Sequence, residues 1–467
     1  MCIVLEKEGN IVEKSKKYEI DMCSGSVFKK MLLFALPLMC SSVLQLLFNA
    51  ADIVVVGRFA GDNALAAVGS TSSLINLLTN LFVGLSIGAN VLVAQYYGAK
   101  KEKDLTETVH TAMLISIFSG VILTVIGIVA ARQILTWMSA PPEVLELAVI
   151  YIRVYFLGMT STMIYNFGSA ILRAVGDTKR PLYYLLGAGI VNVVLNLIFV
   201  IFFDMGVAGV AAATAISQTI SAFLVVRCLI KEQDGIHLEL KELRIVKDKF
   251  IKIVQIGLPA GFQGIVFSLS NVVIQSAINS FGAIVVAGNS AASNIEGFIY
   301  MGMNAFYQAT ISFTSQNYGA RQYKRINRIL LVGELYAIII GVVFGNLAVF
   351  FGEGLLSIYT KSPEAIAAGM LRLSMICAPY ALCGMMDVLV GALRGIGYSV
   401  MPMIVSLIGA CGLRLLWIAT VFQIPEYHTQ QTIYTSYPIT WTVTMMVHAI
   451  CFIWARRKIA KSEKDVN

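Results

Sequence analysis

Apolar and polar residues follow one another along this chain in long blocks. After about 28 mixed polar and charged residues, apolar stretches recur almost to the end, with short polar connections between them. A helix of about 20 apolar residues crosses the roughly 30 Å of hydrocarbon in a bilayer, whereas the strands of a membrane barrel are segments of about ten residues with alternating polarity. The pattern therefore predicts twelve membrane-spanning helices, near residues 31–56, 66–96, 109–131, 148–172, 181–203, 207–230, 251–280, 284–316, 329–351, 366–392, 402–423 and 438–455.

The composition supports an integral membrane protein of the all-α class. Hydrophobic residues make up 57% of the 467 residues and charged residues 13%, against about 45–50% and about 25% in soluble domains. The net charge of +8 would also suit a nucleic-acid-binding protein, but the lysines and arginines lie in the short connections between apolar stretches and form no basic face. We therefore expect contact with the lipid bilayer and with no nucleic acid.

The distribution of lysine and arginine predicts the orientation in the membrane. An even number of spans places both termini on one side, and 29 of the 35 lysines and arginines lie in the tails and connections of that side. Positive charge is retained in the cytoplasm during insertion. The first 28 residues carry charges of both signs and lack a signal-peptide pattern. We therefore expect a protein of the cytoplasmic membrane with both termini in the cytoplasm.

An internal repeat divides the chain into two halves. Three motifs recur at an offset of 221 or 222 positions: Leu-Pro at 36–37 and 258–259, Gln-x-Tyr-Gly-Ala at 95–99 and 316–320, and Leu-Arg-x-x-Gly at 172–176 and 393–397. A constant offset over such a length indicates duplication. Because each half holds six spans, both halves insert the same way up, and a pseudo-twofold axis along the membrane normal relates them.

The repeat and the charged connections predict the domain organisation. We expect two six-helix bundles, joined by a charged cytoplasmic linker and flanked by two tails. The predicted segments are a cytoplasmic N-terminal tail at 1–28, bundles at 29–230 and 251–456, a linker at 231–250, and a cytoplasmic C-terminal tail at 457–467.

These paired motifs resemble the multidrug and toxic compound extrusion (MATE) family of bacterial transporters. The resemblance rests on a proline near the start of spans 1 and 7, on Asn-Ala-Ala-Asp ending at Asp52, on the Gln-x-Tyr-Gly-Ala motifs, and on the Leu-Arg-x-x-Gly-Asp turn. It covers residues 28–456 and implies a V-shaped secondary transporter. Such a protein exports organic, often cationic, compounds against a proton or sodium gradient.

Five polar residues of spans 1 and 5 form the predicted ion-coupling site. Gln45, Asn49 and Asp52 are spaced i, i+4, i+7, which places them on one helical face, and Asn192 and Asn196 lie one turn apart in span 5. If the two faces meet, they form a small polar cavity with one carboxylate, which either exchanges a proton or binds sodium through hard oxygen ligands. The resemblance implies a coupling role for Asp52.

The chain departs from the family in spans 5, 7 and 10, which leaves the coupling ion open. In span 10 the family's acid lies further ahead of the Leu-Arg-x-x-Gly turn than Asp387 does. One branch of the family has an aspartate in span 5 where this chain has Asn196. Another branch has a glutamate in span 7, where the corresponding positions here are Gln263 and Phe267.

A second set of polar residues inside the spans predicts contacts for a substrate. Placing a charged side chain at the centre of a bilayer costs about 2.5–3.5 kcal/mol of free energy, so each one is expected to have a structural or functional role. Asp387 is predicted either to form an ion pair with Arg414 or to contact the substrate. Glu296 is predicted either to contact a cationic substrate or to pair with a residue of the protein interior. Glu334 is predicted to be interfacial, and Arg153 and Arg372 to extend towards headgroups. The predicted cleft residues are Glu296, Asn76, Asn166, Asp387 and Arg414.

The resulting functional prediction is an ion-coupled exporter of small organic cations or amphipathic compounds, acting as a monomer. The alternative is a dedicated exporter or flippase of one amphipathic metabolite, such as a flavin or a lipid-linked precursor.

An enzyme is not expected, because the four histidines are scattered and no nucleophile–base or metal-binding motif is present. No phosphate-binding loop is present either. We expect no cofactor and no structural metal, only H⁺ or Na⁺ as the coupling ion.

Overall fold

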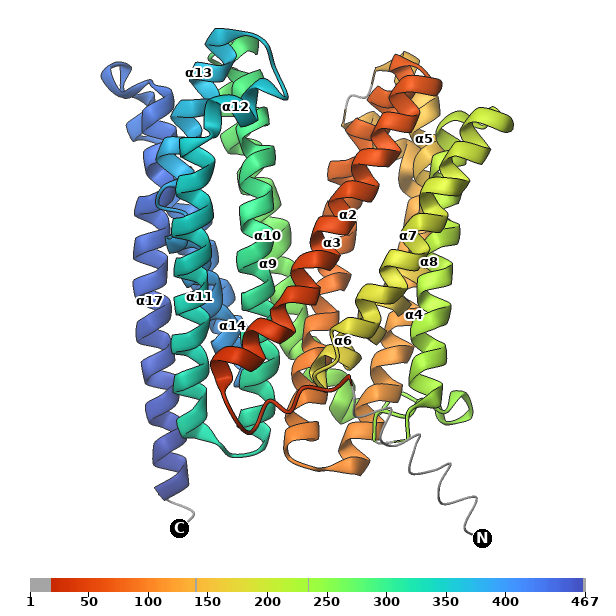
Figure 1. Ribbon diagram of the computed structural model, residues 1–467, viewed down its shortest axis with the longest axis vertical. Coiled ribbons are helices and arrows are strands. Elements are labelled where there is room, and N and C mark those ends of the chain that lie inside the picture. Colours follow the sequence, from red (N-terminus) through yellow and green to blue (C-terminus); the bar gives the residue numbers. More distant parts are fainter. Residues whose placement is uncertain (1–17, 139–140, 234, 465–467) are drawn as a thin grey trace. The chain divides into compact units, whose positions relative to one another are not determined.

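The structure is a computed structural model that describes residues 18–138, 141–233 and 235–464. Within these ranges the chain is helical and contains no strand, which confirms the predicted all-α class (Figure 1). Of the predicted tails, residues 1–17 and 465–467 lie outside the described part. The last helix continues to Lys464, through most of the predicted C-terminal tail.

The predicted spans are found as helices. The first half of the chain contains α2 (Val27–Phe59), α3 (Asp62–Gly98), α4 (Glu102–Trp137), α5 (Pro142–Leu157), α6 (Met159–Ala174), α7 (Lys179–Leu197) with a π-helical end at Ile198–Phe202, and α8 (Gly206–Lys231). The second half contains α9 (Lys247–Asn279), α10 (Ala283–Gly319), α11 (Tyr323–Phe350), α12 (Gly352–Ser357), α13 (Pro363–Arg372) with a π-helical end at Leu373–Cys377, α14 (Ala381–Gly395), α15 (Val400–Ser406) followed by a π-helix at Leu407–Gly412, α16 (Leu413–Ala419) and α17 (Gln430–Lys464).

Two predicted spans are broken helices. Helices α5 and α6 meet at 46°, and the segment from Pro363 to Cys377 meets α14 at 44°. Gly158 lies at the first break and Pro379 in the second, and such residues interrupt the helical hydrogen bonds. In the described part, nine helices are long and apolar enough to cross a membrane, or eleven with each bent pair counted as one. The remaining predicted span corresponds to α10, whose 37 residues include many polar ones.

The backbone repeats with the sequence. Three pairs of residues with positive φ lie 221 positions apart and have nearly equal angles: Gly61 (87°) and Gly282 (92°), Lys100 (55°) and Arg321 (57°), Gly176 (103°) and Gly397 (97°). Helices α2 and α9 both have 33 residues, and α3 and α10 both have 37. The duplication read from the motifs is therefore also a duplication of turn geometry.

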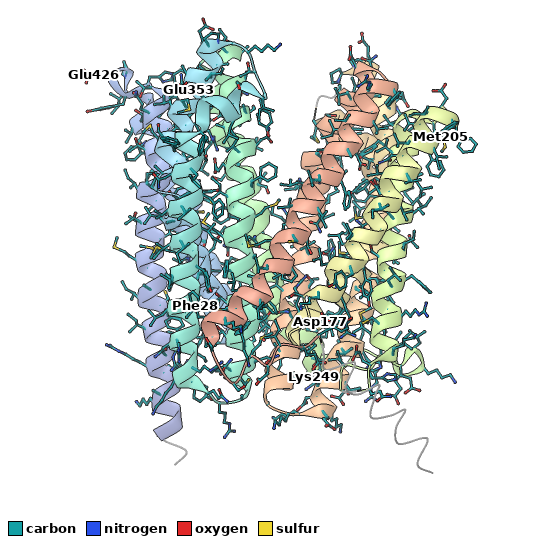
Figure 2. The ribbon with its side chains drawn as sticks, viewed as in Figure 1. Phe28, Asp177, Met205, Lys249, Glu353 and Glu426 are labelled. Atoms are coloured by element: carbon teal, nitrogen blue, oxygen red, sulfur yellow. The ribbon has the colours of Figure 1, made fainter. Side chains whose placement is uncertain are left out.

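The Leu-Arg-x-x-Gly-Asp motif builds the turn between α6 and α7. The Asp177 carboxylate accepts hydrogen bonds from the backbone N–H groups of Lys179 and Arg180, each at 3.1 Å, and so caps the start of α7 (Figure 2). The guanidinium of Arg180 forms ion pairs with Asp177 and with Glu232, at the end of α8. Burial raises the pKa of Asp177, although Arg180 acts in the opposite direction.

The chain forms two compact units with borders inside helices. The N-terminal unit comprises Met1–Met22 and Leu36–Gly261, and the C-terminal unit comprises Cys23–Ala35 and Phe262–Asn467. The borders lie next to Pro37 in α2 and two residues beyond Pro259 in α9, whereas the sequence analysis placed the division in the linker at 231–250.

The linker belongs to the N-terminal unit because α4 binds its backbone. Thr106 donates a hydrogen bond to the carbonyl of Gly235 at 3.1 Å. His110 Nε2 accepts one from the N–H of Glu239 at 3.1 Å. Thr111 accepts one from the N–H of Val246, also at 3.1 Å. These contacts fix both ends and the middle of the connection before α9 begins.

Helices α3 and α9 approach each other closely within the N-terminal unit. A Cβ added at Gly88 would lie 2.2 Å from the carbonyl oxygen of Ile253, whereas one added at Gly69, in the same helix, would meet nothing within 4 Å. We therefore expect Gly88→Ala to lower the free energy of unfolding by about 1–3 kcal/mol, because the added methyl group overpacks the contact. Thermal unfolding of the purified protein, with Gly69→Ala as the matched control, measures this. Equal stability of the two variants would contradict the close contact.

Candidate functional site

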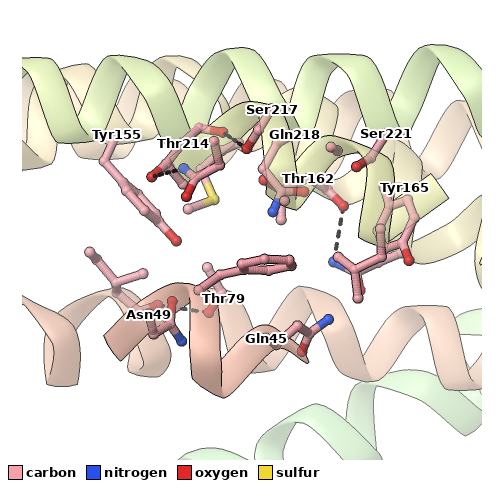
Figure 3. Close-up of a pocket in the computed structure, with 18 of the residues that line it drawn as sticks. Gln45, Asn49, Thr79, Tyr155, Thr162, Tyr165, Thr214, Ser217, Gln218 and Ser221 are labelled. Carbon is pink, nitrogen blue, oxygen red and sulfur yellow. Dashed lines mark hydrogen bonds between the residues drawn. The ribbon is translucent and has the colours of Figure 1, made fainter. Parts of the chain in front are cut away.

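A cavity of about 340 Å³ lies inside the N-terminal unit, between α2, α3, α5, α6, α7 and α8 (Figure 3). Its apolar lining consists of Phe48, Ile75, Val83, Met159, Leu185, Ala188 and Gly189. The polar lining is larger and consists of Gln45, Asn49, Asp52, Asn76, Thr79, Asn80, Tyr155, Thr162, Tyr165, Asn166, Asn192, Thr214, Ser217, Gln218 and Ser221. Among the described residues, the lining includes one carboxylate and no lysine or arginine.

Asp52 is held at the wall of this cavity by a network of hydrogen bonds. Its side chain is 8% exposed, and Asn196 donates an amide hydrogen bond to its Oδ1. The same amide of Asn196 lies 3.3 Å from Asn192 Oδ1. The Thr214 hydroxyl lies 3.4 Å from Asp52 Oδ2 and accepts a hydrogen bond from Asn192 at 3.2 Å. The polar faces of spans 1 and 5 therefore meet, as the sequence pattern suggested.

Within residues 18–138, 141–233 and 235–464, the network provides no basic partner for the charge of Asp52. Asn196 and Thr214 donate to the carboxylate, but the Thr214 proton is shared with the carbonyl of Val210 at 3.0 Å. Asn196 Oδ1 is buried and has no hydrogen-bond partner in the described part of the chain. A buried charge is either paired or neutralised. The arrangement therefore suits a carboxylate that is neutralised by a proton, a metal cation or a cationic ligand.

Two residues predicted for a separate cleft lie in this same cavity. Asn76 on α3 and Asn166 on α6 line it together with Asp52. Asn166 donates its amide to the carbonyl of Thr162 at 2.9 Å, within its own helix. In the structure, these two predicted cleft residues therefore share one cavity with the predicted ion-coupling residues.

The sequence analysis missed the wall formed by α8. Thr214, Ser217, Gln218 and Ser221 all line the cavity. Their spacing of i, i+3, i+4, i+7 is that of one helical face, so the signal was present in the sequence. It is weaker than the signal in span 1 because hydroxyl groups are common inside membrane helices, where they bond to their own backbone.

The structure corrects the expectation for Arg372 and gives Glu296 an interior partner, which was one of its two predicted alternatives. Arg372 is 7% exposed, and its Nη2 lies 2.6 Å from Glu296 Oε2. Its Nη1 donates to Asn289 Oδ1 at 2.7 Å, and Tyr434 donates to the same oxygen at 3.2 Å. Arg372 does not extend towards headgroups, because it has a carboxylate on the neighbouring α10. The charge of Glu296 is neutralised by this arginine, which argues against a contact with a cationic substrate.

Arg414 also has a different environment from the predicted one. It forms no ion pair with Asp387. Its guanidinium donates to Thr440 at 3.0 Å and lies 3.9 Å from the centre of the Tyr437 ring, a cation–π contact. Asp387 instead has Arg394 and Tyr300 as its polar neighbours. The reason is geometric, since the guanidinium of Arg414 reaches α17.

Gln263, at the family's alternative acidic position, is bound by an arginine. Arg394 donates to Gln263 Oε1 at 2.8 Å and also to the hydroxyl of Tyr307. The amide therefore takes part in the internal packing of the C-terminal unit. Phe267, the other candidate position, carries no polar group.

Glu334 on α11 was predicted to lie at the membrane interface, but its carboxylate is buried. Both of its carboxylate oxygens are buried and have no hydrogen-bond partner in the described part. We expect Glu334→Met to raise the free energy of unfolding by about 1–3 kcal/mol, because it removes two unsatisfied polar atoms and keeps an unbranched side chain. The control is Glu353→Met at the exposed Glu353 (Figure 2), where a change within about 0.5 kcal/mol is expected. Loss of stability at Glu334, measured by thermal unfolding, would show that the carboxyl has a partner.

Twelve expected spans, a twofold repeat and a polar cavity inside one bundle define a multi-pass membrane transporter, and sequence comparison gives its family. The MatE family model matches residues 37–198 and 259–419, one match in each half and together more than half of the chain. The chain belongs to the MATE family, a family of transporters and not of enzymes.

Curated relatives and solved structures agree with this assignment. The chain is 28% identical to "Probable multidrug resistance protein YoeA" of Bacillus subtilis, over 93% of this chain and 96% of that protein. It is 26% identical to "Probable multidrug resistance protein NorM" of Thermotoga maritima, over 83% and 84%. A structure titled as the outward-facing conformation of a multidrug resistance MATE family transporter matches with a TM-score of 0.87 at 22% identity, over 95% of this chain and 98% of that chain. The structural match supports the fold.

Proposed function

We propose that this protein is a secondary active antiporter that exports organic, often cationic, compounds in exchange for H⁺ or Na⁺. The observation that carries the proposal is the carboxylate of Asp52 in a polar cavity. In the part of the chain that the structure describes, it is the single carboxylate of the lining, and no lysine or arginine lies beside it. Bacterial relatives named as a probable multidrug resistance protein and as a multidrug export protein support the substrate class.

Competition for one carboxylate gives a physical basis for exchange. When a proton or a sodium ion neutralises Asp52, the cavity has no negative charge left to attract a cation. When the ion leaves, the carboxylate binds a cationic compound, with Asn196 and Thr214 holding it in position. Because each ligand excludes the other, release of one is required for binding of the other, and this negative coupling between the two ligands supports exchange.

The two parallel repeats support alternating access as the mode of transport. We propose that the two six-helix bundles expose the site to each side of the membrane in turn, and that the protein acts as a monomer. The excess of lysine and arginine in the connections on the side of both termini supports an N-in, C-in orientation in a bacterial cytoplasmic membrane.

Transport into inverted membrane vesicles tests this function. A fluorescent organic cation is supplied outside, and a pH gradient and a sodium gradient are imposed separately. Uptake driven by one gradient, and absent from vesicles without the protein, is the expected result and names the ion. Failure of both gradients to drive uptake of any cation, with the protein folded, would favour the dedicated export of one metabolite instead.

A further inference from the structure

Many polar groups of the cavity have no partner within the protein. In the described part of the chain, seven lining side chains take part in no hydrogen bond: Gln45, Asn49, Asn76, Asn80, Tyr155, Gln218 and Ser221. Two of these groups, Gln218 Oε1 and Ser221 Oγ, are also shielded from solvent. Figure 3 shows Gln45 and Asn49 on the α2 side and Gln218 and Ser221 on the α8 side.

This lining differs from that of most small-molecule sites. Such sites are predominantly hydrophobic and contain a few polar groups that orient the ligand. Here polar residues outnumber apolar ones, and five of the seven unbonded side chains are carboxamides, each with two donors and one acceptor. A ligand that enters displaces the water bound to these groups and must replace its hydrogen bonds.

A lipophilic cation would satisfy Asp52 and leave the carboxamides unpaired. Each buried polar group that loses its partner lowers affinity by about tenfold or more. A site built to hydrogen-bond its ligand therefore rejects analogues without hydroxyl or amino groups far more strongly than an apolar pocket does. Anionic ligands are disfavoured, because Asp52 provides negative charge and the described lining residues include no lysine or arginine.

We propose that this cavity selects small hydrophilic cations: compounds with one amine-type positive charge next to Asp52 and several hydroxyl or amino groups around it, such as amino sugars. The proposal rests on the proposed export function and narrows its substrate class. The cavity volume of about 340 Å³ is at the lower end of the usual range for small-molecule sites, about 300–1,000 Å³, and so fits a ligand of one sugar ring.

A matched pair of ligands tests the proposal by equilibrium binding. Glucosamine and cyclohexylamine both carry one ammonium group on a six-membered ring, but only glucosamine carries hydroxyl groups. Calorimetry on the purified full-length protein, with no ion gradient, is expected to show glucosamine binding at least tenfold more tightly. Equal or tighter binding of cyclohexylamine would overturn the proposal, and so would the absence of measurable glucosamine binding.

Two substitutions of lining residues test whether the carboxamides cause the preference for glucosamine. Gln45→Leu and Gln218→Leu replace a carboxamide by an apolar group of similar size, and each is expected to weaken glucosamine binding about tenfold without weakening cyclohexylamine binding. Gln133→Leu, at an exposed position of α4 outside the cavity, is the control and should leave the ratio of the two affinities unchanged. An unchanged ratio in both glutamine variants, with unfolding temperatures like the wild type, would contradict the role of the carboxamides.

Binding and transport separate this proposal from the proposed function. If glucosamine binds selectively and no ion gradient drives transport, the antiport function fails and the selectivity stands. If lipophilic cations bind more tightly and are exported, the selectivity fails and the antiport function stands.

Discussion

Arg372→Met is expected to lower the free energy of unfolding by about 3–5 kcal/mol, because it leaves the charge of Glu296 buried and unpaired. The guanidinium of Arg372 contacts Glu296 through two nitrogens, at 2.6 and 3.2 Å. It also donates to Asn289, which is 1% exposed, so its removal leaves a second buried acceptor with fewer partners. The measurement is the midpoint of denaturant-induced unfolding in detergent.

An exposed ion pair of the same chemistry is the control for this prediction. Arg132 and Glu146 also approach to 2.6 Å, but their side chains are 53% and 63% exposed. We expect Arg132→Met to cost less than about 1 kcal/mol, because water solvates the remaining carboxylate. The double variant Arg372→Met with Glu296→Gln should recover part of the loss, since it removes the orphaned charge. Equal effects at Arg372 and Arg132 would contradict the burial of the Glu296 pair.

Asp52→Asn is expected to abolish gradient-driven export and to leave the fold intact. For one-for-one exchange, a tenfold ion gradient stores about 1.4 kcal/mol and sustains a substrate gradient of about tenfold. Without the carboxylate neither the ion nor a cationic substrate is attracted, so this substrate gradient should disappear. An asparagine has the same shape, and its amide oxygen still accepts the hydrogen bond from Asn196.

The matched control removes an acidic group outside the cavity. Asp62 is exposed in the first turn of α3, and Asp62→Asn should transport like the wild type. Vesicles that contain equal amounts of wild type, Asp52→Asn and Asp62→Asn are compared under one gradient. Retained accumulation by Asp52→Asn would move the coupling site to another carboxyl, and Asp387 is the next residue to test.

Most of the fold could be predicted from the sequence, because the sequence patterns that indicate it are local or periodic. Long apolar stretches gave the spans, and an offset of 221 positions correctly paired turns such as those of Gly176 and Gly397. The bend of the α5–α6 pair was not predicted, because an apolar stretch gives length and no direction. The borders of the compact units were also missed, since hydrogen bonds from residues such as Thr106 and His110 to linker backbone have no sequence signature.

The candidate site was predictable only up to the contacts between distant helices. The spacing of Gln45, Asn49 and Asp52 gave one polar face, but the position of Thr214 beside Asp52 depends on how α8 packs. The partner of Arg372 is 76 residues away on α10, and no local pattern distinguishes that pairing from an arginine extended towards the bilayer surface. Pairings of this kind follow from tertiary packing.

The most direct measurement of the central claim is ion movement driven by substrate. Purified protein is reconstituted into liposomes that contain a pH- or sodium-sensitive dye, and a gradient of an organic cation is imposed with no ion gradient. Because coupling is reciprocal, we predict that protons or sodium ions move opposite to the substrate in wild-type liposomes, and that neither ion moves with Asp52→Asn. Substrate flux without movement of either ion in the wild type would contradict antiport through Asp52.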